Sequence, residues 1–374
     1  MKIAHVVGAR PNFMKVAPVW RAIEKEIVCR QILIHTGQHY DVNMSELFFT
    51  DLGLPEPDYF LGVGSGTHGV QTAAVMLAFE KVVMALKPDT VLVYGDVNST
   101  LAAALVCAKQ IISVAHVEAG LRSFDRTMPE EINRVLTDQI ADLLFTPSKD
   151  GDENLLQQGI DPEKIHCVGN VMIDTLVSLQ GAIAEATVEI PSERFLLVTL
   201  HRPSNVDHEE KLKEIVETLA EISREVTVLF PVHPRTAARI SDSGLTLPEG
   251  GNFQLLDPLG YIDFVALEKK AVAVITDSGG MQEETTYLGI PCLTVRANTE
   301  RPVTVTTGTN ILVGGDMKLL REEVTKILSG DGKTGEIPPL WDGKAGKRIA
   351  AVLKKGIRGN IVAGMNIAKG SKNP

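Results

Sequence analysis

The sequence predicts an α/β fold made of two parallel sheets, each covered by helices. Short apolar runs rich in Val and Ile, bounded by turn residues, alternate with segments whose apolar residues recur three and four positions apart. The first pattern is typical of buried parallel strands and the second of helices that cover them. The alternation restarts near the middle of the chain, which predicts two such domains.

The expected elements follow one another in a regular order. We expect four strands in the first half at Ile3–Val7, Gln31–His35, Thr90–Tyr94 and Ser113–Val117. We expect helices between them at Phe13–Glu26, Gly66–Leu86 and Asn98–Gln110. The second half predicts five further strands, at Phe195–Leu200, Val226–Phe230, Phe253–Leu256, Val272–Thr276 and Cys292–Val295.

A chain of 374 residues exceeds the usual size of one domain. We place one Rossmann-like domain at residues 1–170 and another at residues 171–344, with the hinge between Gly169 and Glu193. Parallel sheets bind ligands outside the carboxyl ends of their strands. Two such domains facing a central cleft therefore predict a ligand between them.

Composition excludes several classes of function. A net charge of −10 argues against binding nucleic acid or an anionic membrane. The four cysteines are far apart, which is typical of a reducing compartment rather than of disulfides or a metal site. The first apolar run is too short for a signal peptide, and we expect no stretch approaching the ~20 apolar residues of a membrane span. We therefore expect a cytoplasmic protein without a membrane partner.

The first strand leads into a turn, Gly8 to Lys15, that is suited to an anion. Gly8 permits a tight turn, and a following helix start presents amides to a phosphate, with Arg10 and Lys15 adding charge. An ordinary turn with surface cations is the alternative. The turn is not the G-x-G-x-x-G dinucleotide motif, which counts against a nicotinamide cofactor.

Three carboxylates follow strands or open a helix in the same half: Asp96, Glu118 and Glu131. Each has a structural alternative, since Asp96 is placed to cap a helix, Glu118 to pair with Arg122, and Glu131 to pair with Arg134. All three nevertheless arise near one edge of one domain. Clustered carboxylates raise one another's pKa and so provide both an acid and a base.

The second half carries two further anion motifs. His201 and Arg202 end its first strand, and a lone histidine in such a place is more often structural. In the segment from Thr276 to Glu284, a Ser-Gly-Gly turn connects a strand to the start of a helix. Main-chain amides and the Ser278 hydroxyl would bind a phosphate there. Glu284 lies one turn further, placed to accept hydrogen bonds from ribose, and Arg301 adds a cation near the same edge.

Eight segments in order resemble the non-hydrolysing UDP-N-acetylglucosamine 2-epimerases along nearly the whole chain. They are G-A-R-P-N-F-M-K-V-A-P, T-G-Q-H, Y-G-D-V-N-S-T, H-V-E-A-G-L-R-S, P-E-E-I-N-R, T-L-H-R, D-S-G-G-M-Q-E-E and T-E-R-P. The resemblance implies a glycosyltransferase-B-like architecture whose last helix, about residues 345–365, returns to the first domain. It also implies a UDP-sugar substrate, a homodimer, a place in cell-surface polysaccharide biosynthesis, and neither metal nor other cofactor.

The resemblance also implies roles for individual residues. The catalytic residues would be Asp96, Glu118, Glu131, His201 and Lys15. The UDP-binding residues would be Arg10, Lys15, His201, Phe264 (at the uracil), Ser278, Gly279, Gly280, Glu284 and Arg301. A possible second, activating UDP-sugar site would include Gln38, His39 and Gln71.

Three positions depart from the family pattern. Many members have Arg-Glu where this chain has Pro203-Ser204, and Arg where it has Val70. Both positions help form the second site, so we expect substrate activation to be weak or absent. Met128 stands where tryptophan is common, which leaves open a 2-epimerase of a UDP-2,3-diacetamido-uronic acid.

The implied reaction eliminates UDP to a bound 2-acetamidoglucal and adds it back. The hydrogen on sugar carbon 2 is not acidic, so loss of UDP from the anomeric carbon must assist its removal. Removing the proton from one face of sugar carbon 2 and returning a proton to the other face needs two acid/base groups, which clustered carboxylates can supply. The rivals are a UDP-sugar-dependent glycosyltransferase, a hydrolysing epimerase and a non-catalytic UDP-sugar sensor.

Overall fold

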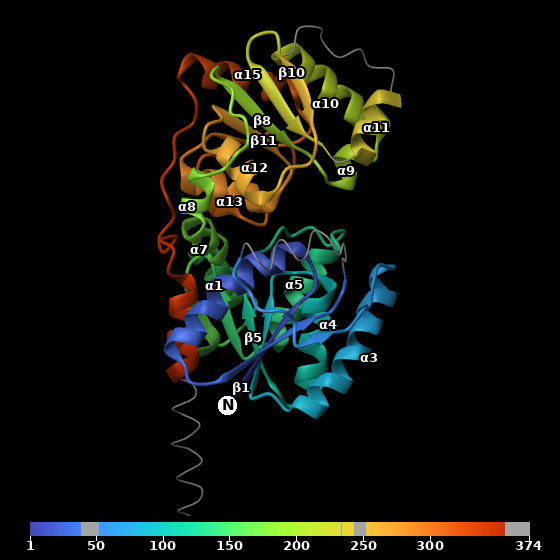
Figure 1. Ribbon diagram of the computed structural model, residues 1–374, viewed down its shortest axis with the longest axis vertical. Helices are drawn as coiled ribbons and strands as arrows, with labels where there is room; N and C mark the ends of the chain where they lie inside the picture. Colours follow the sequence, from blue (N-terminus) through green and yellow to red (C-terminus); the bar gives the residue numbers. More distant parts are fainter. Residues whose placement is uncertain (39–51, 233, 243–251, 356–374) are drawn as a thin grey trace, which may run out of the picture. The chain divides into compact units, whose positions relative to one another are not determined.

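The computed structural model describes all residues except 39–51, 233, 243–251 and 356–374. The chain forms two compact units, each built on one parallel sheet (Figure 1). One unit comprises Met1–Thr175 with the described residues from Pro339 onward, and the other comprises Leu176–Pro338. The two parallel sheets with alternating helices confirm the predicted α/β class.

The first unit has a seven-stranded sheet in the order β3-β2-β1-β4-β5-β6-β7. Its strands are β1 (Lys2–Val7), β2 (Arg30–His35), β3 (Tyr59–Phe60), β4 (Thr90–Tyr94), β5 (Ser113–Val117), β6 (Leu143–Thr146) and β7 (Ile165–Cys167). Its helices are α1 (Arg10–Glu26), α3 (His68–Leu86), α4 (Asn98–Lys109), α5 (Pro129–Ile140), α6 (Lys149–Gln157), the 3-10 turn η1 (Pro162–Lys164) and a last helix at 345–355. Helix α7 (Val171–Ser178) runs across the boundary between the units.

The second unit has a six-stranded sheet in the order β10-β9-β8-β11-β12-β13. Its strands are β8 (Phe195–Thr199), β9 (Thr227–Pro231), β10 (Phe253–Leu256), β11 (Ala273–Thr276), β12 (Cys292–Thr294) and β13 (Asn310–Leu312). Its helices are α8 (Gln180–Ala184), α9 (Pro203–Val206), α10 (Glu209–Ile222), α11 (Pro234–Asp242), α12 (Tyr261–Glu268), α13 (Gly279–Leu288), α14 (Pro302–Thr306) and α15 (Met317–Ser329).

All nine expected strands are present, and each end lies within one residue of its predicted position. Helix α1 begins at Arg10, three residues before the expected start. Pro11 takes the second helical position, where the first turn needs no backbone N–H donor. The short strands β3, β6, β7 and β13 were not foreseen, because runs of two to four residues carry little periodicity.

Helix α3 contradicts the expectation that no stretch approaches a membrane span. It has 19 residues and a hydropathy of 1.5, enough by length and composition to cross a membrane. Val75, Phe79 and Val83 are buried. A second apolar row, Val70, Leu77 and Met84, is exposed on the same helix at intervals of seven residues. The two rows together give α3 its high hydropathy.

The last described helix packs along α1 in the first unit (Figure 1). A Cβ added at Gly346 would lie 2.7 Å from the Pro18 carbonyl oxygen, and Lys354 Nζ lies 3.4 Å from Glu26 Oε2. Asp174 accepts hydrogen bonds from the amides of Ala345 (3.0 Å) and Gly346 (2.8 Å). These contacts attach the end of the described chain to the first unit.

Pro18, inside α1, leaves a carbonyl without its helical donor. Proline has no N–H, so the carbonyl of Met14, four residues earlier, cannot receive the usual helical hydrogen bond. Thr175 Oγ1 donates to that oxygen at 2.6 Å instead. The proline is thereby accommodated without an unsatisfied buried carbonyl.

The strand orders place the candidate residues at one edge of each sheet. The order reverses between β1 and β4 in the first unit and between β8 and β11 in the second. Parallel sheets bind ligands outside the carboxyl ends of strands at such a reversal. The segments that follow these four strands begin at Gly8, Gly95, Leu200 and Asp277, and they contain most of the predicted site.

Candidate active site

One arginine joins two of the three predicted carboxylates in the first unit. Arg134 Nη1 lies 2.5 Å from Asp96 Oδ2, and its Nη2 lies 2.7 Å from Glu131 Oε2. The arginine side chain is 2% exposed. From the sequence, Arg134 was expected to pair only with Glu131 on the same helix. Its contact with Asp96 was not predicted.

Asp96 does not cap the helix that follows it. The N-cap of α4 is Val97, and no side chain caps this helix. The carboxylate instead pairs with Arg134, while Asn133 Nδ2 donates to the Asp96 carbonyl at 2.8 Å. The Asp96 side chain remains 25% exposed, so one face of it is open to a ligand.

Glu118 pairs with Lys15. It does not pair with Arg122, the alternative partner that the sequence offered. Both side chains are buried, and their ion pair joins β5 to α1. Arg122 pairs with Asp138 at 2.7 Å. Glu118 has a φ of 72°, a left-handed conformation that costs a non-glycine residue about 1–3 kcal/mol and is typical of functional sites.

Glu131 accepts five hydrogen bonds from three residues. Its oxygens accept from the Ser123 amide (2.9 Å), the Ser123 hydroxyl (3.0 Å), the Phe124 amide (3.1 Å) and Arg134 Nε (3.1 Å) and Nη2 (2.7 Å). Burial would raise the pKa of Glu131, but these donors and the Arg134 charge together lower it. Glu131 is therefore held as a carboxylate.

The turn after β1 differs from the predicted anion cradle in one respect. The amides of Gly8 and Ala9 donate to Asn12 Oδ1 at 3.0 and 3.1 Å. Gly8 is required because a Cβ there would collide with the side chains of Ser99 and Thr36, rather than for a tight turn. Arg10 begins α1, and its side chain lies outside the described residues.

The residues predicted for a second ligand site are engaged by the protein itself. Gln38 Oε1 accepts from the Ser99 amide (3.1 Å) and hydroxyl (2.7 Å). Gln71 Nε2 donates to the carbonyls of Gln38 (3.2 Å) and Gly64 (2.9 Å), and its Oε1 accepts from Asn98 Nδ2 (2.8 Å). The two side-chain amides therefore link this part of the chain to Asn98 and Ser99, at the start of α4, directly after the turn that carries Asp96. His39 lies outside the described residues.

In the second unit, His201 is oriented by a buried carboxylate. Its Nδ1 lies 3.0 Å from Asp277 Oδ1, and Asp277 also accepts from the His201 and Arg202 amides. Burial would raise the pKa of Asp277, but the His201 and Asn205 side chains and the Arg202 amide lower it. Asp277 stands in the D-S-G-G segment, yet sequence reasoning gave it no role.

The Ser-Gly-Gly turn opens α13 as predicted. Ser278 is the N-cap residue, but its side chain does not cap the helix; Gly279 and Gly280 form the first turn. A Cβ at Gly279 would meet the side-chain ends of Arg301 and Glu300, which lie directly against this turn. Arg301 Nε lies 2.7 Å from Glu283 Oε1, and its Nη1 pairs with Glu300. The arginine therefore lies directly at the helix start.

The remaining predicted residues lie on α12 and α13. Glu284 is buried, and Tyr261, a residue not foreseen, donates its hydroxyl proton to Glu284 Oε1 at 2.7 Å. Phe264 packs against the apolar cluster that contains Phe195 and Leu267. Burial and the charge of Glu284 raise the pKa of Glu268 well above its usual range.

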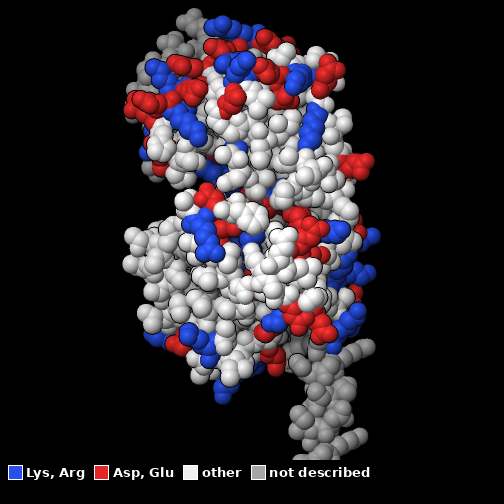
Figure 2. Space-filling model, turned by 180° about the vertical axis from the view of Figure 1, so that it is seen from behind, with Lys and Arg blue, Asp and Glu red and all other residues white. Residues whose placement is uncertain are grey.

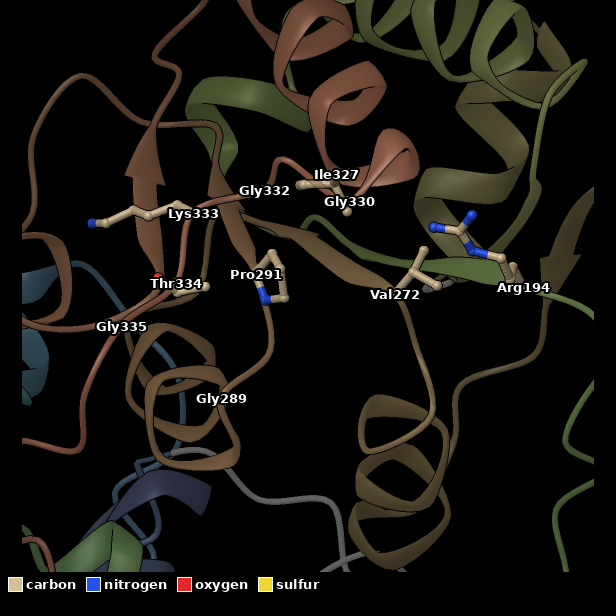
Figure 3. Close-up of a pocket in the computed structure, with 10 residues that line it drawn as sticks. All are labelled: Arg194, Val272, Gly289, Pro291, Ile327, Gly330, Gly332, Lys333, Thr334 and Gly335. Atoms are coloured by element: carbon tan, nitrogen blue, oxygen red, sulfur yellow. The ribbon is translucent and has the colours of Figure 1, made fainter.

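A hollow of about 460 Å³ lies at the other edge of the second sheet (Figure 3). Arg194, Val272 and Pro291 line it, and each precedes a strand rather than following one. Arg194 Nη1 donates to the Leu328 carbonyl at 3.0 Å, and Lys333 Nζ donates to the Asn310 carbonyl at 2.8 Å. Main-chain oxygens bind both cations. Because the hollow lies at the amino ends of the strands, it is distinct from the candidate active site at their carboxyl ends.

Comparison with known proteins identifies the family. The family model described as UDP-N-acetylglucosamine 2-epimerase matches residues 21–354. The UDP-N-acetylglucosamine 2-epimerase of Methanocaldococcus jannaschii is 46% identical over 367 residues, which cover 95% of this chain and 100% of that protein. The UDP-2,3-diacetamido-2,3-dideoxy-D-glucuronate 2-epimerase of Pseudomonas aeruginosa is 42% identical over 362 residues, with coverage of 95% and 100%.

The fold comparison agrees with the sequence comparison. The crystal structure of the M. jannaschii UDP-GlcNAc 2-epimerase in complex with UDP-GlcNAc and UDP matches with a TM-score of 0.86 and 44% identity. The match covers 95% of this chain and 100% of that one. It confirms the predicted glycosyltransferase-B-like fold class. With its ordered motifs, two parallel sheets and clustered carboxylates, this chain belongs to the UDP-N-acetylglucosamine 2-epimerase family.

Proposed function

We propose that this protein is a non-hydrolysing 2-epimerase that interconverts UDP-N-acetylglucosamine and UDP-N-acetylmannosamine. One observation carries the proposal. Asp96, Glu118 and Glu131 gather at the carboxyl edge of the first sheet, held by two cations. A binding module has no use for such a cluster, and neither does a glycosyltransferase that only grips UDP, whereas an epimerase needs proton transfer at two faces of a sugar.

The second unit supplies the groups that hold UDP. The start of α13 presents amides and the Ser278 hydroxyl to the diphosphate, with His201 and Arg301 beside it. Glu284, oriented by Tyr261, accepts hydrogen bonds from the ribose hydroxyls, and Phe264 stacks on the uracil.

The reaction begins with departure of UDP. The bond between the anomeric carbon and the phosphate oxygen breaks, its electron pair leaves with UDP, and a carboxylate takes the proton from carbon 2. The product is a bound 2-acetamidoglucal. UDP then adds back to the anomeric carbon while a proton reaches carbon 2 from the opposite face. Cations around the diphosphate stabilise the charge that develops on the leaving group.

The contacts of the three acids divide their roles. Glu131 already accepts five hydrogen bonds and is kept ionised, so it positions Arg134 and the 123–124 turn. Asp96 keeps an exposed face, and Glu118 has Lys15 as its cationic partner. We assign the two proton-transfer steps to Asp96 and Glu118, one for each face of the sugar.

A UDP-2,3-diacetamido-uronic acid is the second candidate substrate, because a 2-epimerase of such a uronate is 42% identical to this chain. The test is to incubate the pure protein separately with each UDP-sugar and to follow the products by NMR. UDP-N-acetylmannosamine without free UDP supports the proposal. Turnover of the uronate alone reassigns the substrate. Free N-acetylmannosamine with UDP indicates hydrolysis, and UDP binding without turnover of either sugar indicates a sensor.

Substrate activation is expected to be weak or absent. Gln38 and Gln71 are engaged in hydrogen bonds with the protein, and Val70 carries no charge. The rate should therefore rise hyperbolically with UDP-N-acetylglucosamine concentration. Sigmoidal kinetics that disappear on changing Gln71 would contradict this expectation.

The exposed apolar row of α3 supports a homodimer. Val70, Leu77 and Met84 are 66%, 67% and 48% exposed, and Figure 2 shows few charged side chains over this part of the first unit. Contiguous exposed apolar surface marks interaction sites, and a two-fold dimer covers the same patch on both copies. The four free thiols suit the cytoplasm, where a nucleotide-sugar enzyme of polysaccharide synthesis would act.

A further inference from the structure

A fully buried histidine of β5, His116, lies between the turns that carry Asp96 and Glu118. Its side chain is 0% exposed. Its Nδ1 lies 2.6 Å from Asp138 Oδ1 on α5, and its Nε2 lies 2.8 Å from the carbonyl oxygen of Gly95. Each ring nitrogen therefore faces an oxygen, and neither nitrogen has water as an alternative partner.

The two partners of His116 fix its protonation state. A main-chain carbonyl only accepts hydrogen bonds, so Nε2 must carry a proton. Asp138 Oδ2 accepts from Arg122 Nη1 (2.7 Å) and from the Gly120 amide (3.1 Å), contacts that favour its ionised form. An ionised Asp138 only accepts as well, so Nδ1 must also carry a proton. His116 is then an imidazolium.

This histidine and its partner hold both catalytic turns. His116 fixes the carbonyl of Gly95, the residue before Asp96, and Asp138 fixes the amide of Gly120, two residues after Glu118. Glu118 has a positive φ of 72°, which a residue other than glycine keeps only where surrounding contacts determine it. Asp138 provides one such contact by accepting from the Gly120 amide, two residues later.

We propose that His116 is a positioning residue that donates a proton from each ring nitrogen and fixes the Asp96 and Glu118 turns through Gly95 and Asp138. Only its effect on epimerisation rests on the proposed function; its protonation state does not. The charged groups around it are Asp138 on α5, Arg122 after β5, and Lys15 and Glu118 beyond Gly95.

His5 of β1 serves as an internal control. It is also fully buried in the same sheet, with Nδ1 2.7 Å from the Tyr94 hydroxyl and Nε2 3.1 Å from Gln31 Oε1. Neither partner is charged, and the Tyr94 hydroxyl is able to donate or accept. Burial lowers the pKa of His5 to about 3, so His5 is neutral where His116 is charged.

The decisive experiment is nitrogen-15 NMR of the histidine rings in the unaltered protein, with His116→Gln and His5→Gln used for assignment. At pH 7, His116 should show two protonated ring nitrogens while His5 shows one. A His116 ring with one bare nitrogen at pH 7 would overturn the inference. This result stands whether or not the protein epimerises a sugar.

Kinetics then test the positioning role. His116→Gln places the side-chain amide near the position of Nε2 and keeps a donor to the Gly95 carbonyl. His116→Asn places the amide near the position of Nδ1 and loses that donor. We expect H116N to lower kcat roughly 100-fold with KM changed by less than about threefold, and H116Q to recover most of kcat. Equal losses in both variants would overturn the role.

Discussion

His201 Nδ1 lies 3.0 Å from Asp277 Oδ1, a contact in which the carboxylate is fully buried and the imidazole is 60% exposed. Asp277 joins two segments that follow neighbouring strands, β8 and β11. It accepts from the amides of His201 (3.1 Å) and Arg202 (3.0 Å) and from Asn205 Nδ2 (3.0 Å). The carboxylate thus fixes the His201 ring and the turn that carries it, and leaves Nε2 on the exposed side of the ring.

The Asp277→Asn substitution should weaken both stability and UDP binding. It removes a buried carboxylate from four donors, so the free energy of unfolding at pH 7 should fall by roughly 2–3 kcal/mol. The pKa of Asp277 is lowered in the folded state, so its contribution is present above its unfolded pKa and is lost as pH falls below about 4. Urea unfolding at several pH values measures this, and calorimetry should show about tenfold weaker UDP binding.

The matched control is Asp316→Asn. Asp316 caps α15 in the same unit by accepting from the Lys318 and Leu319 amides, and asparagine caps equally well. A D316N protein as destabilised as D277N would contradict the assignment of a special role to Asp277.

Arg134→Lys should damage catalysis more than folding. Lysine keeps the positive charge but cannot contact Asp96 and Glu131 with separate prongs of a planar group. We expect kcat to fall roughly 100-fold and the midpoint of thermal unfolding to fall by a few degrees. Arg126→Lys, at an exposed position eight residues earlier, should leave both unchanged. An R134K enzyme with full kcat would show that the bridge is dispensable.

Tyr261→Phe isolates the orientation of Glu284. The variant loses only the hydroxyl that donates to Glu284 Oε1 at 2.7 Å. One such hydrogen bond is worth about 1 kcal/mol, so UDP should bind roughly fivefold more weakly while kcat at saturation changes little. Tyr287→Phe, on the same helix as Glu284, is the control and should bind UDP normally. Unchanged UDP affinity in Y261F would remove Glu284 from the proposed ribose contact.

Asp174 predicts a pH dependence of the attachment of the last helix. Burial raises the pKa of Asp174 to about 6, despite the hydrogen bonds from the Gly346 and Ala345 amides. The folded protein therefore holds this proton more tightly than the unfolded chain. The resulting stability is complete below about pH 4 and is lost as pH rises through about 6, at a cost of roughly 3 kcal/mol.

Asp174→Asn cannot lose that proton. The difference in unfolding free energy between the unaltered protein and D174N should fall by roughly 3 kcal/mol between about pH 4 and pH 6. Asp161→Asn, which alters an exposed cap in the same unit, should show a constant difference over this range. Chemical denaturation at four pH values measures these differences. A difference between the unaltered protein and D174N that does not change with pH would rule out the raised pKa of Asp174.

Leu77→Glu should disrupt the proposed dimer. The charge would be placed in the middle of the exposed row of α3, so a dimer covering this row would have to bury it. Sedimentation should show a dimer for the unaltered protein and a monomer for L77E. Val28→Glu, at a fully exposed apolar residue outside α3, should remain a dimer. Dimeric L77E would place the interface elsewhere.

Sequence reasoning located the strands and the chemistry of the site because both depend on local pattern. Buried parallel strands are continuous apolar runs, so nine strands were placed within one residue, and Asp96 and Glu118 could be assigned to strand ends. The shorter strands lacked enough residues for a pattern. The apolar content of α3 was underestimated because His68, Gln71, Glu80 and Lys81 interrupt it.

Partner choice among charged side chains was not predictable, because it depends on how helices and turns pack. Spacing along the chain paired Glu118 with Arg122, but packing brings Lys15 from α1 and gives Arg122 to Asp138. Likewise, Arg134 reaches Asp96 only because α5 packs against α4. Asp277 and Tyr261 act through another side chain, and their roles emerged only from the structure, although Asp277 stands in the D-S-G-G segment.

The most direct test of the account is isotope exchange at sugar carbon 2. The pure protein is incubated with UDP-N-acetylglucosamine in deuterium oxide, alongside Asp96→Asn and Glu118→Gln. Proton NMR should show deuterium at carbon 2 of UDP-N-acetylmannosamine and of recovered substrate, with exchange slowed at least about 100-fold in both variants. Epimerised product that keeps its original hydrogen at carbon 2, or full exchange in both variants, would contradict proton transfer by this carboxylate cluster.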